Sequence, residues 1–301
     1  MRLIIHAGTH KTATTSFQTL CFSKKHALSK KGIFIPEFTD KAKIINFTKS
    51  NGIIPKSLTY QHNCLAWYLQ LKNINEVKEF LLIAYKNATE ENCNHILLSA
   101  EDLENILIED CIARNIELIA KEIGFKQIQW IFVKRNPFDY LKSLYSQLSK
   151  ESQIINFYEL YKGIMSNGYY FSNNKKYNTY YVFDIDNFVA SLKNDNSLNI
   201  DIIKFEDFSL PSLGFPIFKK IISIEDFNKL SLKEEKKIEM NKSLTSDQIE
   251  FNYLCNFLQM SKTQEIYDNN KDLFNSLISI RQKKINDQIA NIKESINKKF
   301  S

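Results

Sequence analysis

Short apolar runs and amphipathic stretches alternate along much of this 301-residue chain. A short apolar run bounded by turn residues is typical of a buried strand, whereas apolar positions three and four apart indicate a helix. Amphipathic spacing predicts helices at 75–88, where Val77, Phe80, Leu81 and Ala84 share one face, and at 111–123, before Gly124. The apolar runs predict strands at residues 3–5, 32–36, 95–99, 128–135 and 199–207. This alternation predicts an α/β fold, a three-layer sandwich whose central parallel sheet is flanked by helices.

The other segments fill out a single domain. Residues 157–161 and 180–192 have helical spacing, and the Lys- and Asn-rich tail 264–300 is helical and weakly amphipathic. An aromatic-rich insertion at 40–71, with Trp67 and Tyr68 on a helix, and a polar segment at 167–178 are candidates to shape a substrate pocket or a lid. We expect one domain over residues 1–301, with a nucleotide-binding core of about 1–210 and a helical C-terminal region of about 211–301.

Composition narrows the class of protein. The chain is 44% hydrophobic, enough for a sizeable core, and its net charge of +6 suits an anionic nucleotide or equally a solvated surface. Five cysteines without a C-x-x-C pair indicate reduced thiols, not a disulfide framework or a zinc site. No apolar stretch has the length of a signal peptide or a transmembrane helix, so we expect a cytoplasmic protein. The tail could still cap the fold, pair with a partner or touch a membrane surface.

The first strand runs directly into a candidate phosphate-binding loop. A strand, a loop of small residues and a helix together aim backbone N–H groups and a helix dipole at an anion. In the Walker A pattern G-x-x-x-x-G-K-[ST] the lysine precedes a magnesium-binding hydroxyl. Here Ala13 and Thr14 hold the second glycine and lysine positions, and Lys11 comes three residues too early. The alternatives are a phosphate loop of a different kind and an ordinary turn. The candidate ligand-binding residues are Gly8, Thr9, His10, Lys11, Thr12, Ala13, Thr14, Thr15 and Ser16.

A second strand-to-helix junction carries a candidate anion contact. The strand at 128–135 ends in Arg135, and Pro137 stands where the first turn of a helix is expected. Ser143 follows eight residues after Arg135, about two turns into that helix. A guanidinium at the strand end and a hydroxyl on the helix could bind the same anion.

Together the two segments resemble the sulfotransferases that use 3'-phosphoadenosine 5'-phosphosulfate, in particular their bacterial branch. Residues 8–16 are similar to the branch's 5'-phosphosulfate loop, close to G-T-H-K-T-G-T-T-S, with Ala13 in place of glycine. That change is tolerated if the backbone there is not left-handed. Residues 135–145 are similar to the 3'-phosphate motif R-x-P-x-D-x-x-x-S-x-Y, with matches at Arg135, Pro137, Asp139, Ser143 and Tyr145. The resemblance covers the nucleotide-binding half well and the remainder loosely.

The resemblance implies a P-loop NTPase-like fold and a reaction. A sulfuryl group would pass from the donor nucleotide to a hydroxyl or amine of an acceptor. The acceptors to expect are carbohydrates and glycolipids, and not nucleic acids. Lys11 would stabilise the leaving phosphate, and Arg135 and Ser143 would bind the 3'-phosphate. Because the sulfuryl group carries less charge than a phosphoryl group, no metal ion is required.

The reaction needs a base for the acceptor proton. Glu101 is the first candidate, because it follows the strand at 95–99, at the sheet edge where ligands bind in α/β folds; it could instead cap the next helix. Sulfotransferases use a glutamate or a histidine, which keeps His10 as the second candidate, whereas His6 is expected to be a packed strand-end residue. The alternative functions are a P-loop kinase-like phosphotransferase and a non-catalytic nucleotide- or glycan-binding protein.

Overall fold

The computed structural model describes residues 1–38, 62–151, 153–172, 178–196, 198–209, 212–230 and 244–301. The chain forms two compact units, one of Met1–Arg135 with Phe171–Met240 and one of Asn136–Tyr170 with Asn241–Ser301.

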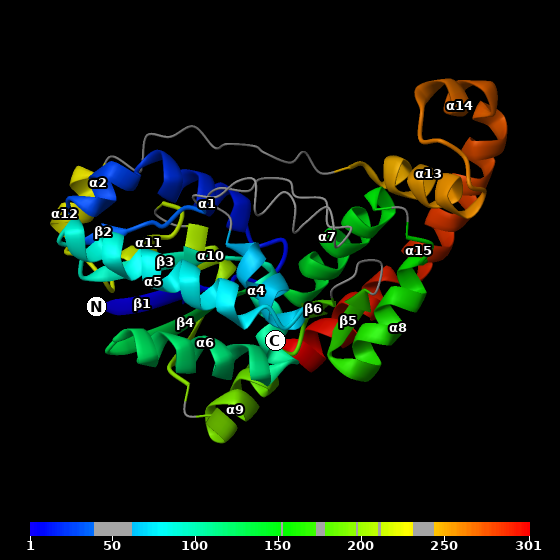
Figure 1. Ribbon diagram of the computed structural model, residues 1–301. Coiled ribbons are helices and arrows are strands. Elements are labelled where there is room, and N and C mark those ends of the chain that lie inside the picture. The colour runs from blue at the N-terminus through cyan, green and yellow to red at the C-terminus, as the bar shows by residue number, and fades with distance from the viewer. Residues whose placement is uncertain (39–61, 152, 173–177, 197, 210–211, 231–243) are drawn as a thin grey trace. The chain divides into compact units, whose positions relative to one another are not determined.

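A five-stranded parallel sheet forms the centre of the first unit (Figure 1). Its strand order is β2-β3-β1-β4-β7, so β1 is central, and Ile5 lies in register with Leu98 of β3 and Trp130 of β4. The predicted parallel sheet is thereby confirmed, although the last strand is shorter than expected because the chain turns into α10 (Phe205–Ser209) after Lys204. The strands are β1 (Arg2–His6), β2 (Ile33–Phe34), β3 (His95–Ser99), β4 (Gln127–Lys134) and β7 (Ile200–Lys204).

Helices cover both faces of this sheet, because successive side chains of a buried strand point to opposite sides. On one face Ile4, Leu97 and Ile131 join a core with residues of α1 (Thr14–Ser23), α2 (Lys25–Ser29), α10, α11 (Phe215–Phe218) and α12 (Ile224–Lys229). On the other face the indole N–H of Trp130 donates to Glu117 of α6 (Asp110–Ile123) at 3.3 Å. Helix α5 (Ile74–Glu90) packs on α6 and β3. The sheet is therefore flanked by helices, as predicted.

The segment expected to be a helix at 180–192 begins as a strand. Residues Thr179–Val182 form β6, which pairs with β5 (Tyr169–Ser172), and α9 (Ile185–Asn196) starts only afterwards. The aromatic and β-branched residues of β6 favour a strand, and a tertiary hydrogen bond from the Val182 N–H to Glu104 holds it there. The helical prediction was wrong for these residues.

Two segments predicted to shape the acceptor site lie partly outside the described residues. Of the insertion at 40–71 the structure describes the end, where Trp67 and Tyr68 lie on α4 (Asn63–Gln70) as expected. Of the segment at 167–178, residues 173–177 are likewise outside the described part.

The second unit is helical where described, apart from the first residues of β5. Pro137 begins α7, and the side chain of Asn136 accepts hydrogen bonds from the N–H groups of Phe138 and Asp139. The Tyr145 hydroxyl of α7 donates to Glu250 of α13 at 2.8 Å, and Glu250 also accepts from Arg281 of α15. The predicted helical tail is confirmed. The helices are α7 (Pro137–Lys150), α8 (Phe157–Asn167), α13 (Ser246–Phe257), α14 (Gln264–Asn269) and α15 (Lys271–Phe300). None of the helices in the described part of the chain has the length and apolar character needed to cross a membrane.

Candidate functional site

The loop after β1 leaves the middle of the sheet at its carboxyl edge. After β1 the chain continues toward β2, on one side of the sheet, and after β4 it continues toward β7, on the other. In open parallel sheets, ligands bind where neighbouring strands send their connections in opposite directions. Gly8 stands at the start of this loop, where there is no room for a side chain. A Cβ there would lie 2.6 Å from His6 Nε2 and 2.8 Å from Thr14 Oγ1.

Hydroxyl groups inside the loop fix its conformation. The Thr9 hydroxyl donates to the carbonyl of Val133 in β4 at 2.6 Å, and the Thr12 hydroxyl donates to the carbonyl of Thr9 at 2.5 Å. Both side chains are buried. Each hydroxyl has one proton to donate, so these two serve the loop in this structure and not a ligand. Thr14, Thr15 and Ser16 form the first turn of α1.

Two loop residues other than glycine have left-handed backbones, Lys11 at φ 65° and Ala13 at φ 60°. Ala13 therefore does not meet the condition under which alanine would replace glycine without strain, and the cost is about 1–2 kcal/mol. Ala13 is also the N-cap of α1, which has no side-chain cap and no acidic residue in its first turn. Helix geometry leaves the first N–H groups of α1 without helical partners, and they can bind an anion.

Arg135 reaches the loop from the end of β4. Its Nη1 donates to the Lys11 carbonyl at 2.8 Å, and its guanidinium lies over the ring of Phe205, 5.2 Å from the centroid. The structure thus brings together two residues from the two sequence motifs. Ser143 is half-buried on α7, in the second unit.

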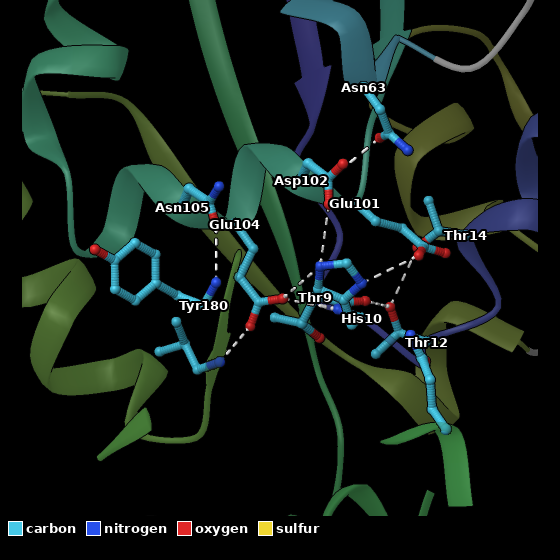
Figure 2. Close-up of polar contacts among 12 residues, drawn as sticks. Thr9, His10, Thr12, Thr14, Asn63, Glu101, Asp102, Glu104, Asn105 and Tyr180 are labelled. Carbon is cyan, nitrogen blue, oxygen red and sulfur yellow. Dashed lines mark hydrogen bonds and ion pairs between the residues drawn. The ribbon is translucent and has the colours of Figure 1, made fainter. Parts of the chain in front are cut away.

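An acidic turn follows β3 and faces the loop (Figure 2). Glu101 occupies the N-cap of the 3₁₀ helix η1 (Asp102–Leu107) without capping it. Its carboxylate lies 3.2 Å from His10 Nδ1 and 3.5 Å from the Thr15 hydroxyl, and its side chain is 25% exposed. Glu101 is therefore the carboxylate of this turn that solvent and a substrate can reach.

The other two carboxylates of the turn are buried. Asp102 accepts a hydrogen bond from the Trp67 indole at 2.6 Å and lies 3.4 Å from His10 Nε2. Glu104 accepts the backbone N–H of His10 at 2.9 Å and that of Val182 at 2.6 Å. These bonds tie the loop to η1, α4 and β6.

The charge of His10 follows from this setting. Burial would lower the pKa of His10, but the contacts with Asp102 and Glu101 and the charge of Glu104 raise it to about 10. These contacts favour the imidazolium form of His10 at neutral pH. Burial raises the pKa of Glu104 to about 7, against the opposing effect of His10 and of the two backbone donors.

Two further histidines meet at the end of β3. His6 is buried, as expected for a packed strand end, and its Nδ1 lies 2.9 Å from the Ser99 hydroxyl. The Ser99 backbone N–H donates to His62 Nδ1 at 2.9 Å, so His62 Nε2 carries the proton that it shares with the Pro36 carbonyl. Burial lowers the pKa of His6 to about 3 and also lowers that of His62. Both imidazoles are neutral around pH 7.

Sequence reasoning missed the roles of Trp67, Asp102 and Glu104. Three acids in the run Glu101-Asp102-Leu103-Glu104 directly after a buried strand are a signal of an acidic turn at the ligand edge. No sequence signal pairs this turn with His10, which lies 94 positions before Glu104.

Among the described residues, no group of three or more His, Cys, Asp and Glu side chains is arranged to hold a metal ion. Comparison of the chain with protein-family models, with curated proteins and with solved structures found no match.

Proposed function

We propose that this protein is a sulfotransferase that uses 3'-phosphoadenosine 5'-phosphosulfate. The observation that carries the proposal is the loop from Gly8 to Ala13, which leaves the central strand at the ligand edge and is bound by Arg135 from the neighbouring strand. The arrangement of strand, loop and helix in the middle of a parallel sheet also suits the P-loop NTPase-like fold that the resemblance implies.

The charges at the loop fit an anionic nucleotide. His10 faces the three carboxylates of the acidic turn and, when protonated, offsets their charge. Arg135 adds a positive charge at the loop, where it donates to the Lys11 carbonyl. The uncapped first turn of α1 adds N–H groups and the positive end of a helix dipole. Lys11 and the α1 amides would hold the 5'-phosphosulfate, and Arg135 the 3'-phosphate.

The position of Lys11 favours sulfuryl over phosphoryl transfer. A P-loop kinase places its lysine directly before the hydroxyl that binds magnesium, and here Thr14 and Thr15 occupy those positions. The donor supplies a sulfuryl group that is already activated by its bond to phosphate. The chain then needs to bind two anionic ends of a nucleotide and to place a base, which Lys11, Arg135 and Glu101 can do.

In the proposed reaction Glu101 takes the acceptor's proton. The O–H bond of the acceptor breaks, its oxygen forms a bond to sulfur, and the bond between sulfur and the bridging oxygen breaks. The electron pair leaves with adenosine 3',5'-bisphosphate, and Lys11 offsets the charge that develops there. The acceptor is a hydroxyl or amine compound, and carbohydrates and glycolipids are the classes to screen first.

Calorimetric titration of the full chain with adenosine 3',5'-bisphosphate, beside ATP with Mg²⁺ and adenosine 5'-phosphate, tests the proposal. We expect micromolar binding of the bisphosphate and weak binding of the other two, because they lack the 3'-phosphate. Tighter binding of ATP with Mg²⁺ would favour a kinase instead. Binding of none of the three would contradict a donor-nucleotide site.

A further inference from the structure

The imidazole of His10 is enclosed by acidic groups from one turn of the chain (Figure 2). Glu101 at the start of η1 lies 3.2 Å from Nδ1, and within η1 Asp102 and Glu104 lie 3.4 and 4.0 Å from Nε2. From β6 the ring of Tyr181 packs against the imidazole, with the centroids 4.8 Å apart. The His10 side chain is 7% exposed.

This geometry favours a positive charge on His10. Both ring nitrogens face carboxylate oxygens, which accept hydrogen bonds and do not donate them when ionised. A neutral imidazole has one N–H and would turn its lone pair toward one of these oxygens. Only the imidazolium presents an N–H group to the carboxylates on both sides, and it is also the form that offsets buried carboxylates.

We propose that His10 is a positioning residue, a buried cation that holds the Glu101 carboxylate in place and offsets the acidic turn so that an anion can bind at the adjacent Lys11. The second part of this inference rests on the proposed nucleotide site, and the first part does not. An imidazolium has no lone pair with which to accept a proton, so His10 acts through Glu101 and through the charge of the loop.

The protonation of His10 can be measured directly by nuclear magnetic resonance. The chain has five histidines, and loss of one set of ring signals in His10→Gln assigns those of His10. We expect both ring nitrogens of His10 to have the shifts of an imidazolium at pH 8, and in Glu101→Gln we expect the His10 titration to move about 1–3 pH units lower. A neutral His10 at pH 8, or an unchanged titration in Glu101→Gln, would overturn the inference.

Binding of adenosine 3',5'-bisphosphate tests the second part. In His10→Gln we expect affinity to fall about tenfold at pH 8 and less at pH 6, where the Glu104 carboxylate, whose pKa is raised to about 7, takes up a proton. A loss of packing alone would weaken binding equally at both values. His26→Gln, the same substitution at an exposed histidine of α2, is the matched control. If His10→Gln does not fold, the His10 ring signals are assigned through bonds from its backbone resonances, and comparison with Glu101→Gln still decides its protonation.

The outcomes separate this inference from the proposed function. If the unaltered protein does not bind the bisphosphate, the proposed function fails, while the protonation of His10 is still decided by resonance. If the unaltered protein binds the bisphosphate and His10→Gln binds it with the same affinity as the unaltered protein at both pH 6 and pH 8, the positioning role of His10 is wrong.

Discussion

At the scale of single residues, Ala13 is a strained position that a substitution can relieve. Its left-handed backbone is one that glycine adopts without the clash of a Cβ. Ala13→Gly removes that strain but gives the unfolded chain more freedom, so we expect the free energy of unfolding to rise by up to about 1 kcal/mol. Urea denaturation would measure this. Ala190→Gly, on an exposed position of α9, should lower the free energy of unfolding by about 1 kcal/mol; equal losses in both variants would contradict the assigned strain.

Lys11 and Arg135 have separable contributions. If the proposed function is right, Lys11→Ala should weaken binding of adenosine 3',5'-bisphosphate by about 1.5–3 kcal/mol, since it removes the proposed charged contact to phosphate, and should stop the proposed sulfuryl transfer. Arg135→Ala should lower both affinity and stability, because Arg135 also donates to the Lys11 carbonyl. Calorimetry and urea denaturation of both variants, with the exposed Lys30→Ala as control, would check this. Unchanged affinity of Lys11→Ala for adenosine 3',5'-bisphosphate would contradict the proposed contact between Lys11 and phosphate.

The sequence was enough to predict which residues belong to the candidate site, but not which residues contact one another there. The segment from Gly8 to Ser16, Glu101 and Arg135 stood out because each lies at a strand-to-helix junction, and the structure brings Glu101 and Arg135 to the loop. The contacts of His10 with Asp102 and Glu104 could not be predicted, because they depend on how β1 and β3 pair in the sheet. The left-handed backbone of Ala13 was also beyond prediction, since alanine is an unusual choice there.

At the scale of elements, buried strands were predictable because their apolar runs are continuous. Residues 180–182 were misassigned because their spacing is compatible with a helix, and the deciding contacts come from β5 and from Glu104. Tertiary contacts outweigh such a weak local preference. The helices α5 and α6 had clear apolar faces and were predicted closely.

The start of α7 gives a testable case of one element supporting another. The Phe138 N–H is within hydrogen-bond distance of two side-chain oxygens, Asn136 Oδ1 at 3.1 Å and Asn297 Oδ1 of α15 at 3.2 Å. Asn136 also accepts from the N–H of Asp139, so Asn136→Ala should lower the free energy of unfolding by about 1–2 kcal/mol and Asn297→Ala by about 0.5–1 kcal/mol.

Chemical denaturation of these variants would test whether the tail helix supports this junction. Asn291→Ala, on an exposed position of the same helix, is the control and should change stability by less than about 0.5 kcal/mol. A loss in Asn291→Ala equal to that in Asn297→Ala would mean that the hydrogen bond to Phe138 contributes nothing of its own.

At the scale of the whole molecule, buried histidines make stability depend on pH in opposite directions: His10 in one direction, and His6 and His62 in the other. His10 has its pKa raised from 6.5 to about 10 in the folded protein, so its contribution is complete below pH 6.5 and is lost as pH rises toward 10. His6 has its pKa lowered to about 3, and His62 also has a lowered pKa, so their contributions are present above pH 6.5 and are lost as pH falls. Glu104, whose pKa is raised to about 7, opposes the two neutral histidines between pH 4.5 and 7.

We therefore expect the free energy of unfolding to be greatest near pH 6.5–7 and to fall on both sides, by at most about 1.4 kcal/mol per pH unit for each proton. Urea denaturation between pH 5 and pH 9 would measure the profile. His10→Gln should be less stable overall and should lose the part of the fall between pH 7 and pH 9 that comes from the imidazolium. The Glu104 carboxyl, whose pKa His10 lowers, accounts for the fall that remains. His26→Gln, which removes an exposed imidazole, should leave the profile unchanged. If His10→Gln kept the full alkaline fall, the cation enclosed by Glu101, Asp102 and Glu104 would not be the source of that dependence, and the charge assigned to His10 would have to be revised.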